Sequence, residues 1–279
     1  MNGMKFYKMH GIGNDYIYFD CMKEDIAEPE KLSITLSDRH FGIGGDGIIL
    51  LCPSHKADIK MRMFNADGSE GRMCGNGIRC LSKLAHDLGY VHGDTCSVET
   101  LSGIKKLQFF FDKDNKVGSV RVDMGSPILS GREIPSSFSG DRVVNEPLQI
   151  DGVEYRVTLV NMGNPHCVVF SDPDNLDLER IGKKFENNPA FPDRINTEFV
   201  RVTGENSLKM RVWERGSGET LACGTGACAV AVASVLNGLC DKNKPITVSL
   251  LGGKLEIEYR DTVYMTGSAT LVYTGEIEI

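Results

Sequence analysis

Two cysteines in this chain occupy nearly the same sequence window. Cys74 lies in KMRMFNADGSEGRMCGNG, and Cys223 lies in KMRVWERGSGETLACGTG about half a chain further on. Each window runs from Lys-Met-Arg through a turn rich in Gly, Ser and Glu to Cys-Gly-x-Gly. A thiol at the same place in both copies suggests two acid/base groups that face one substrate. Such a pair could remove a proton from one face of a carbon and return one to the other.

Each of these cysteines comes directly before a predicted helix. The first N–H groups of a helix have no intrahelical acceptor, and the helix dipole adds partial positive charge there. Both effects stabilise a thiolate and should lower the pKa of each thiol from about 8.5. The same N–H groups can bind a carboxylate, Gly75 and Gly224 allow a ligand to approach closely, and Asn76 and Thr225 are good capping residues. We therefore predict an amino-acid site with one sulfur on each side of the α-carbon.

Nothing in the sequence indicates a cofactor or a metal. No lysine context typical of pyridoxal phosphate is evident, so the thiols would act without that electron sink. The cysteines near Cys74 and Cys223 lack Cys-x-x-Cys spacing and have no neighbouring histidine pair, which argues against zinc. GIGGDG at 42–47 fits G-x-G-x-x-G, but a strand-like run follows it where a dinucleotide site needs a helix. We interpret it as a glycine-rich turn.

Two further roles for the cysteines remain open at this point. Small buried cysteines commonly serve only as packing residues, and we expect this of the other seven cysteines. For Cys74 and Cys223, packing must also account for two matched, glycine-flanked helix starts. A thiol redox protein would instead cycle the pair as a disulfide, which would consume both acid/base groups.

Polar residues near the cysteines are further site candidates. Asn65 and Glu214 occupy equivalent positions before the two cysteines, and Arg215 follows Glu214. A carboxylate and a guanidinium at one strand end could bind an ammonium and a second carboxylate of a substrate. An exposed ion pair accounts for these two residues equally well.

A duplicated Gly-Asn turn supplies two more candidates, Asn14 and Asn164. Both could be Asx-turn residues, and their duplication raises the odds of a role in the site only modestly. His166 follows the second turn and has no catalytic partner visible in the sequence. A structural role for this histidine is at least as reasonable as a catalytic one.

The repeat extends over the whole chain and indicates two homologous halves. IGNDYIYFD is echoed by MGNPHCVVFSD, and SVETLSGIKKLQF by TVSLLGGKLEIEY, at nearly the same offset as the cysteine windows. The join, near 124–145, is rich in Gly, Pro and Ser, as a linker would be. We predict an N-terminal half over 1–125 and a C-terminal half over 126–279.

Most segments within each half resemble strands, and one strong helix follows each Cys-Gly. The helices are predicted over 76–88 and 225–239, each ending near a glycine. The second is apolar nearly all round and should be enclosed by sheet. The fold class is therefore α+β, with each half a curved, mostly antiparallel sheet or barrel wrapped around a central helix.

The composition is that of an ordinary globular protein. The chain has 279 residues, 41% of them hydrophobic, and a formal net charge of −7. With no basic stripe, a nucleic-acid partner is not expected. The longest apolar run, at 227–236, is too short for a membrane span, so no membrane partner is expected either. The N-terminus lacks the apolar segment of a secretory signal, and the odd number of irregularly spaced cysteines is typical of reduced cytosolic thiols.

Five motifs resemble the diaminopimelate epimerase family. They are KMHGIGNDY (8–16), HFGIGGDG (40–47), FNADGSEGRMCGNGIRC (64–80), NMGNPHCVVF (161–170) and ERGSGETLACGTGACA (214–229). The resemblance implies a cofactor-free and metal-free enzyme that interconverts LL- and meso-diaminopimelate on the route to lysine and peptidoglycan. It also implies two pseudo-symmetric domains with the site between them, a C-terminal strand (about 270–279) packed on the first domain, and a homodimer.

The resemblance assigns roles to individual residues. Cys74 and Cys223 would be the two acid/base groups, with the α-carboxylate held by Gly75 and Asn76 and by Gly224 and Thr225. The rest of the substrate would contact Asn14, Asn65, Asn164, Asn196, Glu214 and Arg215. His166 and Glu214 would tune the thiol pKa values. Gly47 stands where some family members carry a glutamine, so a side-chain contact there is not expected.

A related activity on the same fold, the racemisation of proline or hydroxyproline, is the main alternative. Both activities need paired cysteines. The longer diamino diacid also needs polar contacts far from the reacting carbon, which Asn65, Asn196 and Arg215 could supply. Turnover of diaminopimelate but not of proline would separate the two.

Overall fold

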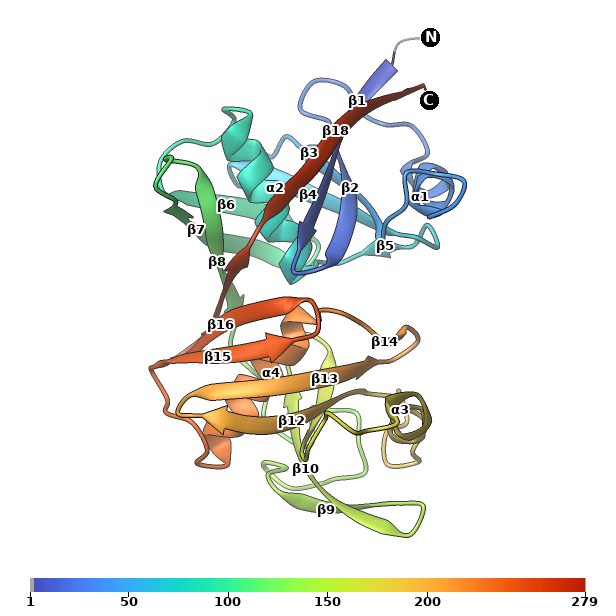
Figure 1. Cartoon of the computed structure of the whole chain (residues 1–279), viewed down its shortest axis with the longest axis vertical. Coiled ribbons are helices and arrows are strands. Elements are labelled where there is room, and N and C mark those ends of the chain that lie inside the picture. Colours follow the sequence, from blue (N-terminus) through green and yellow to red (C-terminus); the bar gives the residue numbers. More distant parts are fainter. Residues whose placement is uncertain (1–2, 279) are drawn as a thin grey trace. The chain divides into compact units, whose positions relative to one another are not determined.

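The computed structural model describes residues 3–278, and these form two compact units (Figure 1). Unit 1 contains the residues up to Asp123 together with those from Thr266 onward, and unit 2 contains Met124–Met265. Unit 1 is therefore built from both ends of the chain.

Unit 1 is a curled sheet with two helices. Its strands and helices are β1 (Gly3–Gly11), β2 (Asn14–Asp20), α1 (Pro29–Ser37), β3 (Gly47–Cys52), β4 (Ile59–Asn65), β5 (Glu70–Gly71), α2 (Gly75–Asp87), β6 (Thr95–Thr100), β7 (Gly103–Phe111), β8 (Val117–Gly125) and β18 (Thr270–Glu278). Strand β18 pairs antiparallel with β1, so the last strand of the chain belongs to the same sheet as the first.

Unit 2 repeats this arrangement. Its elements are β9 (Glu146–Ile150), β10 (Val153–Asn161), β11 (Pro165–Phe170), α3 (Leu178–Glu186), β12 (Asn196–Gly204), β13 (Ser207–Glu214), β14 (Gly218–Glu219), α4 (Gly224–Leu236), β15 (Pro245–Leu250), β16 (Gly253–Tyr259) and β17 (Val263–Ser268). Strand β9 pairs antiparallel with β10, as β18 does with β1. The duplication seen in the sequence is thus a duplication of topology.

The predicted α+β class is confirmed, but each unit is more mixed than the sequence indicated. Besides antiparallel neighbours, unit 1 has the parallel pairs β2–β3 and β4–β6, and unit 2 has β11–β12 and β13–β15. Each parallel pair is joined through a helix, because parallel neighbours need a crossover connection. The short helices α1 and α3 make two of these connections and were not predicted.

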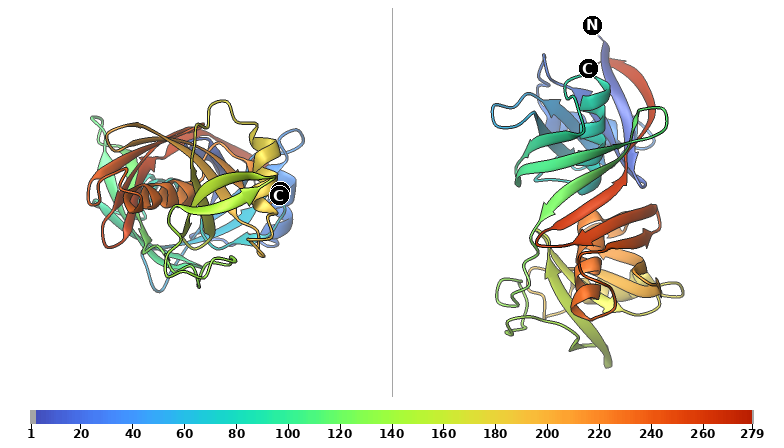
Figure 2. Two further views of the ribbon diagram at one scale, coloured as in Figure 1. Left: turned by 90° about the horizontal axis from the view of Figure 1, so that it is seen from below. Right: turned by 90° about the vertical axis from the view of Figure 1, so that its left-hand side faces the viewer.

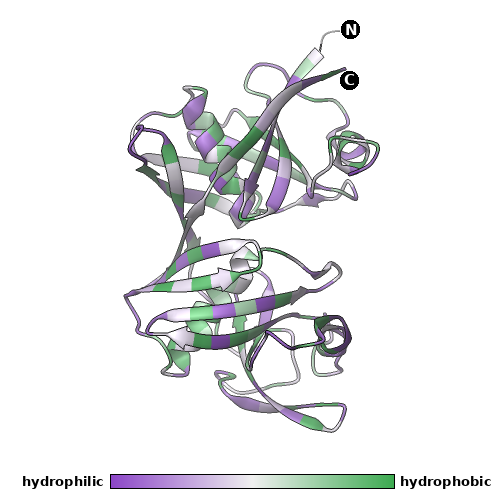
Figure 3. Ribbon diagram, viewed as in Figure 1, coloured by the Kyte–Doolittle hydropathy of each residue, from purple (hydrophilic) through white to green (hydrophobic). Residues whose placement is uncertain are grey.

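Helix α4 lies in the middle of the curled sheet of unit 2 (Figure 2). Its residues Gly226–Ser234 are all buried, which confirms the expectation that an all-apolar helix is enclosed by sheet. The surrounding strands alternate between buried apolar and more exposed polar residues, as β13 shows (Figure 3). Within residues 3–278, no helix is both long enough and apolar enough to span a membrane.

Helix α2 carries a buried thiol that should make unit 1 sensitive to alkaline pH. Burial raises the pKa of Cys80 from 9.0 to about 11. The folded state therefore holds the thiol proton more tightly than the unfolded state does. The free energy of unfolding keeps this contribution in full below pH 9 and loses it as the pH rises toward 11. Across this range, we expect the free energy of unfolding of wild type to fall by about 2–3 kcal/mol relative to that of Cys80→Ala. Urea unfolding at several pH values measures it.

The matched control is Val91→Ala, which removes buried apolar volume from unit 1 without removing an ionisable group. The free energy of unfolding that this substitution removes should not depend on pH. If the change caused by Cys80→Ala is equally independent of pH, the thiol does not contribute to the alkaline transition.

Candidate active site

Cys74 is the N-cap residue of α2. Its backbone is extended (φ −125°, ψ 120°), and its Sγ accepts a hydrogen bond from the Gly77 N–H at 3.3 Å. The sulfur thus satisfies one of the N–H groups that a helix start leaves without a partner. Gly75 and Asn76, in the first turn, are buried, whereas Cys74 itself is only half-buried.

Cys223 is the N-cap residue of α4 in the same geometry. Its backbone is also extended (φ −113°, ψ 107°), its Sγ accepts from the Gly226 N–H at 3.4 Å, and the Thr225 hydroxyl lies 3.6 Å from the sulfur. The predicted placement of both cysteines at helix starts is confirmed.

The expectation of a lowered thiol pKa is wrong for Cys223. Burial raises the pKa of this thiol well above its ordinary value, and the nearby carboxylates of Glu214 and Glu198 raise it further. The Thr225 hydroxyl and the Gly226 N–H lower it, but they do not compensate. Loss of water around the sulfur therefore outweighs the helix start.

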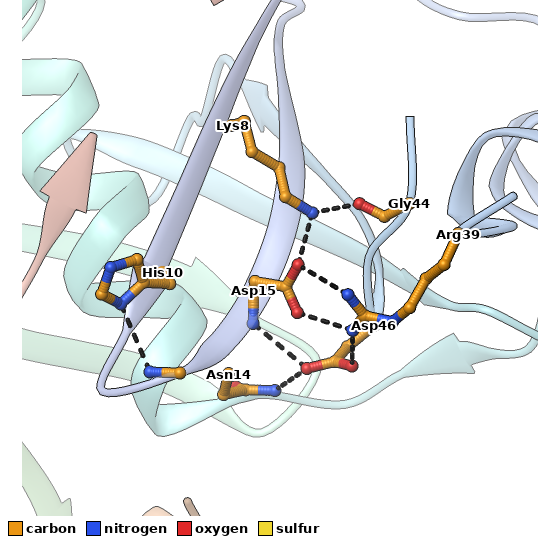
Figure 4. A network of polar contacts seen from close by, with 8 residues as sticks. Lys8, His10, Asn14, Asp15, Arg39, Gly44 and Asp46 are labelled. Carbon is orange, nitrogen blue, oxygen red and sulfur yellow. Dashed lines mark hydrogen bonds and ion pairs between the residues drawn. The ribbon is translucent and has the colours of Figure 1, made fainter. Parts of the chain in front are cut away.

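Asn14 connects Cys74 to a network of charged residues in unit 1. The Cys74 thiol donates to Asn14 Oδ1 at 3.2 Å, and Asn14 Nδ2 donates to Asp46 Oδ2 at 2.7 Å. Asp46 in turn pairs with Arg39, which also binds Asp15 (Figure 4). The sequence did not single out Asp46, which lies in the glycine-rich motif that we interpreted only as a turn.

A strand follows those glycines, as the sequence indicated, because Gly47 begins β3. Gly47 has φ +154°, and a Cβ placed on it would lie 2.0 Å from the Phe64 carbonyl oxygen. No side chain fits at this position without a shift of the backbone.

His166 does have a partner, which the sequence did not reveal. His166 and Glu198 are both fully buried, and Nδ1 of the histidine lies 2.6 Å from Oε1 of the glutamate. Nε2 of His166 lies 3.1 Å from Asn164 Oδ1. Burial raises the pKa of Glu198, and its contacts with His166 oppose that shift. An imidazole with partners on both nitrogens is held in one orientation.

Glu198 also lies against the start of α4. A Cβ on Gly226 would be 2.7 Å from Glu198 Oε1 and 3.2 Å from Cys223 Sγ. The glycine therefore leaves room for the carboxylate and the sulfur to approach the same turn of the helix. Only the parallel pairing of β11 with β12 brings Glu198 and His166 together, and no local pattern in the sequence signals it.

Removing the Glu198 carboxylate should destabilise unit 2. Glu198→Ala leaves the buried Nδ1 of His166 without its partner, and we expect the free energy of unfolding to fall by about 2–4 kcal/mol. Urea denaturation measures this change. Glu179→Ala is the matched control, because it removes a glutamate from an exposed ion pair with Lys183. Equal costs for the two variants would show that the His166–Glu198 contact contributes little.

Asn196, Glu214 and Arg215 lie together in unit 2, and their side chains bind different groups. Asn196 is buried; its Nδ2 donates to the Pro165 carbonyl at 3.1 Å, and its Oδ1 accepts from the Arg215 N–H at 3.0 Å. Glu214 accepts from the Thr220 hydroxyl at 2.5 Å, while the exposed Arg215 side chain donates to the backbone of the segment before β12.

The equivalent turns of the two units use equivalent contacts. Asn65 ends β4 and donates to the Ser69 hydroxyl at 3.0 Å, as Glu214 ends β13 and binds Thr220. Glu70 pairs with Arg62 at 2.9 Å, and Glu219 pairs with Arg211 at 2.7 Å. The duplicated glutamates therefore organise the turns that precede the cysteines.

The family model for diaminopimelate epimerase matches residues 6–130 and 158–272. The chain belongs to the diaminopimelate epimerase family. It is 53% identical over 280 residues to the diaminopimelate epimerase of Acetivibrio thermocellus, covering 99% of both chains. It is 52% identical to that of Agathobacter rectalis, covering 99% of this chain and all of the relative.

A solved structure of this fold is that of a probable proline racemase from Agrobacterium radiobacter K84. It matches with a TM-score of 0.69 over 99% of this chain and 93% of the racemase, at 12% identity. At that identity the likeness concerns the fold alone. This chain thus shares its fold with a probable proline racemase.

Proposed function

We propose that this protein is an isomerase that interconverts LL-2,6-diaminopimelate and meso-diaminopimelate with two thiols and no cofactor. The observation that carries the proposal is the matched pair of N-cap cysteines, Cys74 on α2 and Cys223 on α4, in a member of the diaminopimelate epimerase family. The relatives that are about half identical over the full chain support this substrate.

In the proposed mechanism the two units close their helix starts on one substrate. One cysteine, as thiolate, removes the α-proton, and the other, as thiol, delivers a proton to the opposite face of the carbon. The pair then exchanges roles in the reverse direction. The α-carboxylate is held by the first-turn N–H groups at Gly75 and Asn76 and at Gly224 and Thr225, because these groups and the helix dipole favour an anion.

The remaining polar residues are proposed to bind the distal end of the substrate. Asn14, Asn65, Asn164, Asn196, Glu214 and Arg215 supply amide, carboxylate and guanidinium groups. Asn196 uses its Nδ2 on the Pro165 carbonyl, and we propose that the second N–H of this group binds the substrate. His166 and Glu214 are proposed to tune the pKa values of the thiols. The effect of the Glu214 carboxylate, which raises the pKa of Cys223, supports this role.

The wider setting is also a proposal. We infer a cytoplasmic enzyme, in agreement with its odd number of irregularly spaced cysteines, that supplies meso-diaminopimelate for lysine and peptidoglycan synthesis. The units are proposed to be the two homologous halves of the enzyme, and two copies of the chain to form a homodimer. Size-exclusion chromatography with light scattering tests the dimer.

The deciding experiment is proton exchange in deuterated water. Reduced protein with a metal chelator and no added cofactor is incubated with LL-diaminopimelate, and α-deuterium and configuration are followed by NMR. We expect deuterium to enter with inversion, and no exchange into proline. Exchange into proline alone would favour the racemase activity, and no exchange into either would refute the two-thiol proposal.

A further inference from the structure

Asn14 is held by a network of charged residues in unit 1, which we call the Asn14 network. It consists of Lys8, Asn14, Asp15, Arg39 and Asp46 (Figure 4). Asp46 Oδ2 accepts from Asn14 Nδ2 at 2.7 Å and from the Asp15 N–H at 3.1 Å, and Asp46 Oδ1 pairs with Arg39 at 3.0 Å. Three donors therefore fix this carboxylate in place.

The Asp46 carboxylate decides which way the Asn14 amide faces. An ionised carboxylate can only accept hydrogen bonds, so the amide must turn its NH₂ group toward Asp46. The carbonyl oxygen of the amide then points the other way, and it lies 3.2 Å from Cys74 Sγ. The orientation of Asn14 thus follows from the charge of Asp46 and not from the cysteine.

A carbonyl oxygen beside a sulfur distinguishes the two protonation states of a cysteine. An S–H group can donate a hydrogen bond to the oxygen. A thiolate at the same distance would be repelled by the partial negative charge of that oxygen. The Gly77 N–H on the other side can donate to the sulfur in either state. The contact with Asn14 therefore favours the thiol.

The other charged and titratable groups near Cys74 act in both directions. Tyr16 and Tyr18 approach from β2, and burial raises the pKa of both phenols well above the ordinary value, so both are neutral. The Tyr16 hydroxyl also hydrogen-bonds to Cys74, and the buried Arg79 guanidinium lies on the same helix, so these two groups favour the thiolate. Cys80, on α2 itself, is a buried thiol whose pKa is raised. Asp46 contributes a negative charge on the same side.

We propose that Asp46 is a positioning residue that turns the Asn14 carbonyl toward Cys74 and so keeps Cys74 protonated in the free protein. The proposal rests on the proposed role of Cys74 as one of the two acid/base groups. In the direction in which Cys74 acts as the acid, its thiol gives a proton to the α-carbon and becomes a thiolate. Cys223 must by then have lost its own proton, which the free protein holds more tightly than an ordinary thiol does. Neither Asp46 nor Arg39 touches the substrate in this proposal; both act through Asn14.

The test is the rate at which iodoacetamide alkylates Cys74 at neutral pH, measured by mass spectrometry of its peptide. Asp46→Asn lets Asn14 turn its NH₂ group toward the sulfur, and we expect alkylation about tenfold faster than in wild type. Asp46→Glu keeps a carboxylate and should restore a rate near that of wild type. Asp15→Asn is the matched control, because it removes the same charge from the Asn14 network without touching the Asn14 side chain.

A faster rate in Asp46→Asn alone supports positioning. Equal acceleration in Asp46→Asn and Asp15→Asn would show a general charge effect and overturn the proposal, as would an unchanged rate in a folded Asp46→Asn variant. If that variant does not fold, the infrared spectrum of wild type is the deciding measurement. The S–H band of Cys74 is identified by its loss in Cys74→Ser, and absence of this band from wild type overturns the proposal. Neither measurement uses substrate, so failure here is separate from failure of the proton-exchange experiment.

Discussion

Replacing either Cys74 or Cys223 with alanine should lower kcat/KM for epimerisation of diaminopimelate by about 10³- to 10⁴-fold in both directions. A positioned acid/base group contributes about 10²- to 10⁴-fold, and epimerisation needs one such group on each face of the carbon. Alanine can neither take nor give a proton. The remaining thiol serves only one face, so both directions fail together. Coupled assays from each isomer measure the loss.

Cys80→Ala and Cys228→Ala are the matched controls for this prediction. They remove a buried thiol from the same two helices, α2 and α4, but not from the N-cap. We expect their kcat/KM to stay within about threefold of wild type, since they lose packing and no acid/base group. If Cys74→Ala or Cys223→Ala behaved like these controls, the repeated cysteines would mark the fold and not the mechanism.

Mild oxidation should abolish activity, and a reducing agent should restore it. A disulfide forms only when the two Cα atoms lie within about 7 Å, so a Cys74–Cys223 bond would show that the units bring the helix starts together. Added diamide would take two electrons and two protons from the thiols and be reduced to the hydrazine. We expect a linked pair of tryptic peptides under non-reducing conditions, and full recovery of activity with dithiothreitol.

Substrate and mutation provide the controls for this second prediction. Saturating diaminopimelate should slow inactivation, because in the proposed mechanism the substrate lies between the two sulfurs. Cys74→Ser should yield no linked peptide. If the fully linked protein kept its activity, the thiols would not be the acid/base groups, and a redox role would have to be reconsidered.

Features that depend on local pattern could be predicted from the sequence. The duplicated windows identified Cys74 and Cys223 as equivalent residues and placed both before helices, and both are N-caps. Capping residues, glycines and the alternation of apolar residues act over a few positions, so helices α2 and α4 and strands such as β13 were predictable. The all-apolar character of α4 also predicted that the sheet encloses it.

Which distant side chains meet depends instead on how the strands assemble. Asp46 reaches Asn14, and Glu198 reaches His166, because parallel strands joined through α1 and α3 bring these segments side by side. The two short helices lacked a long periodic pattern that would reveal them. The pKa of Cys223 could not be predicted from the sequence for the same reason. The position of Cys223 at a helix start was predictable, but its pKa is dominated by burial, which is a property of the folded unit.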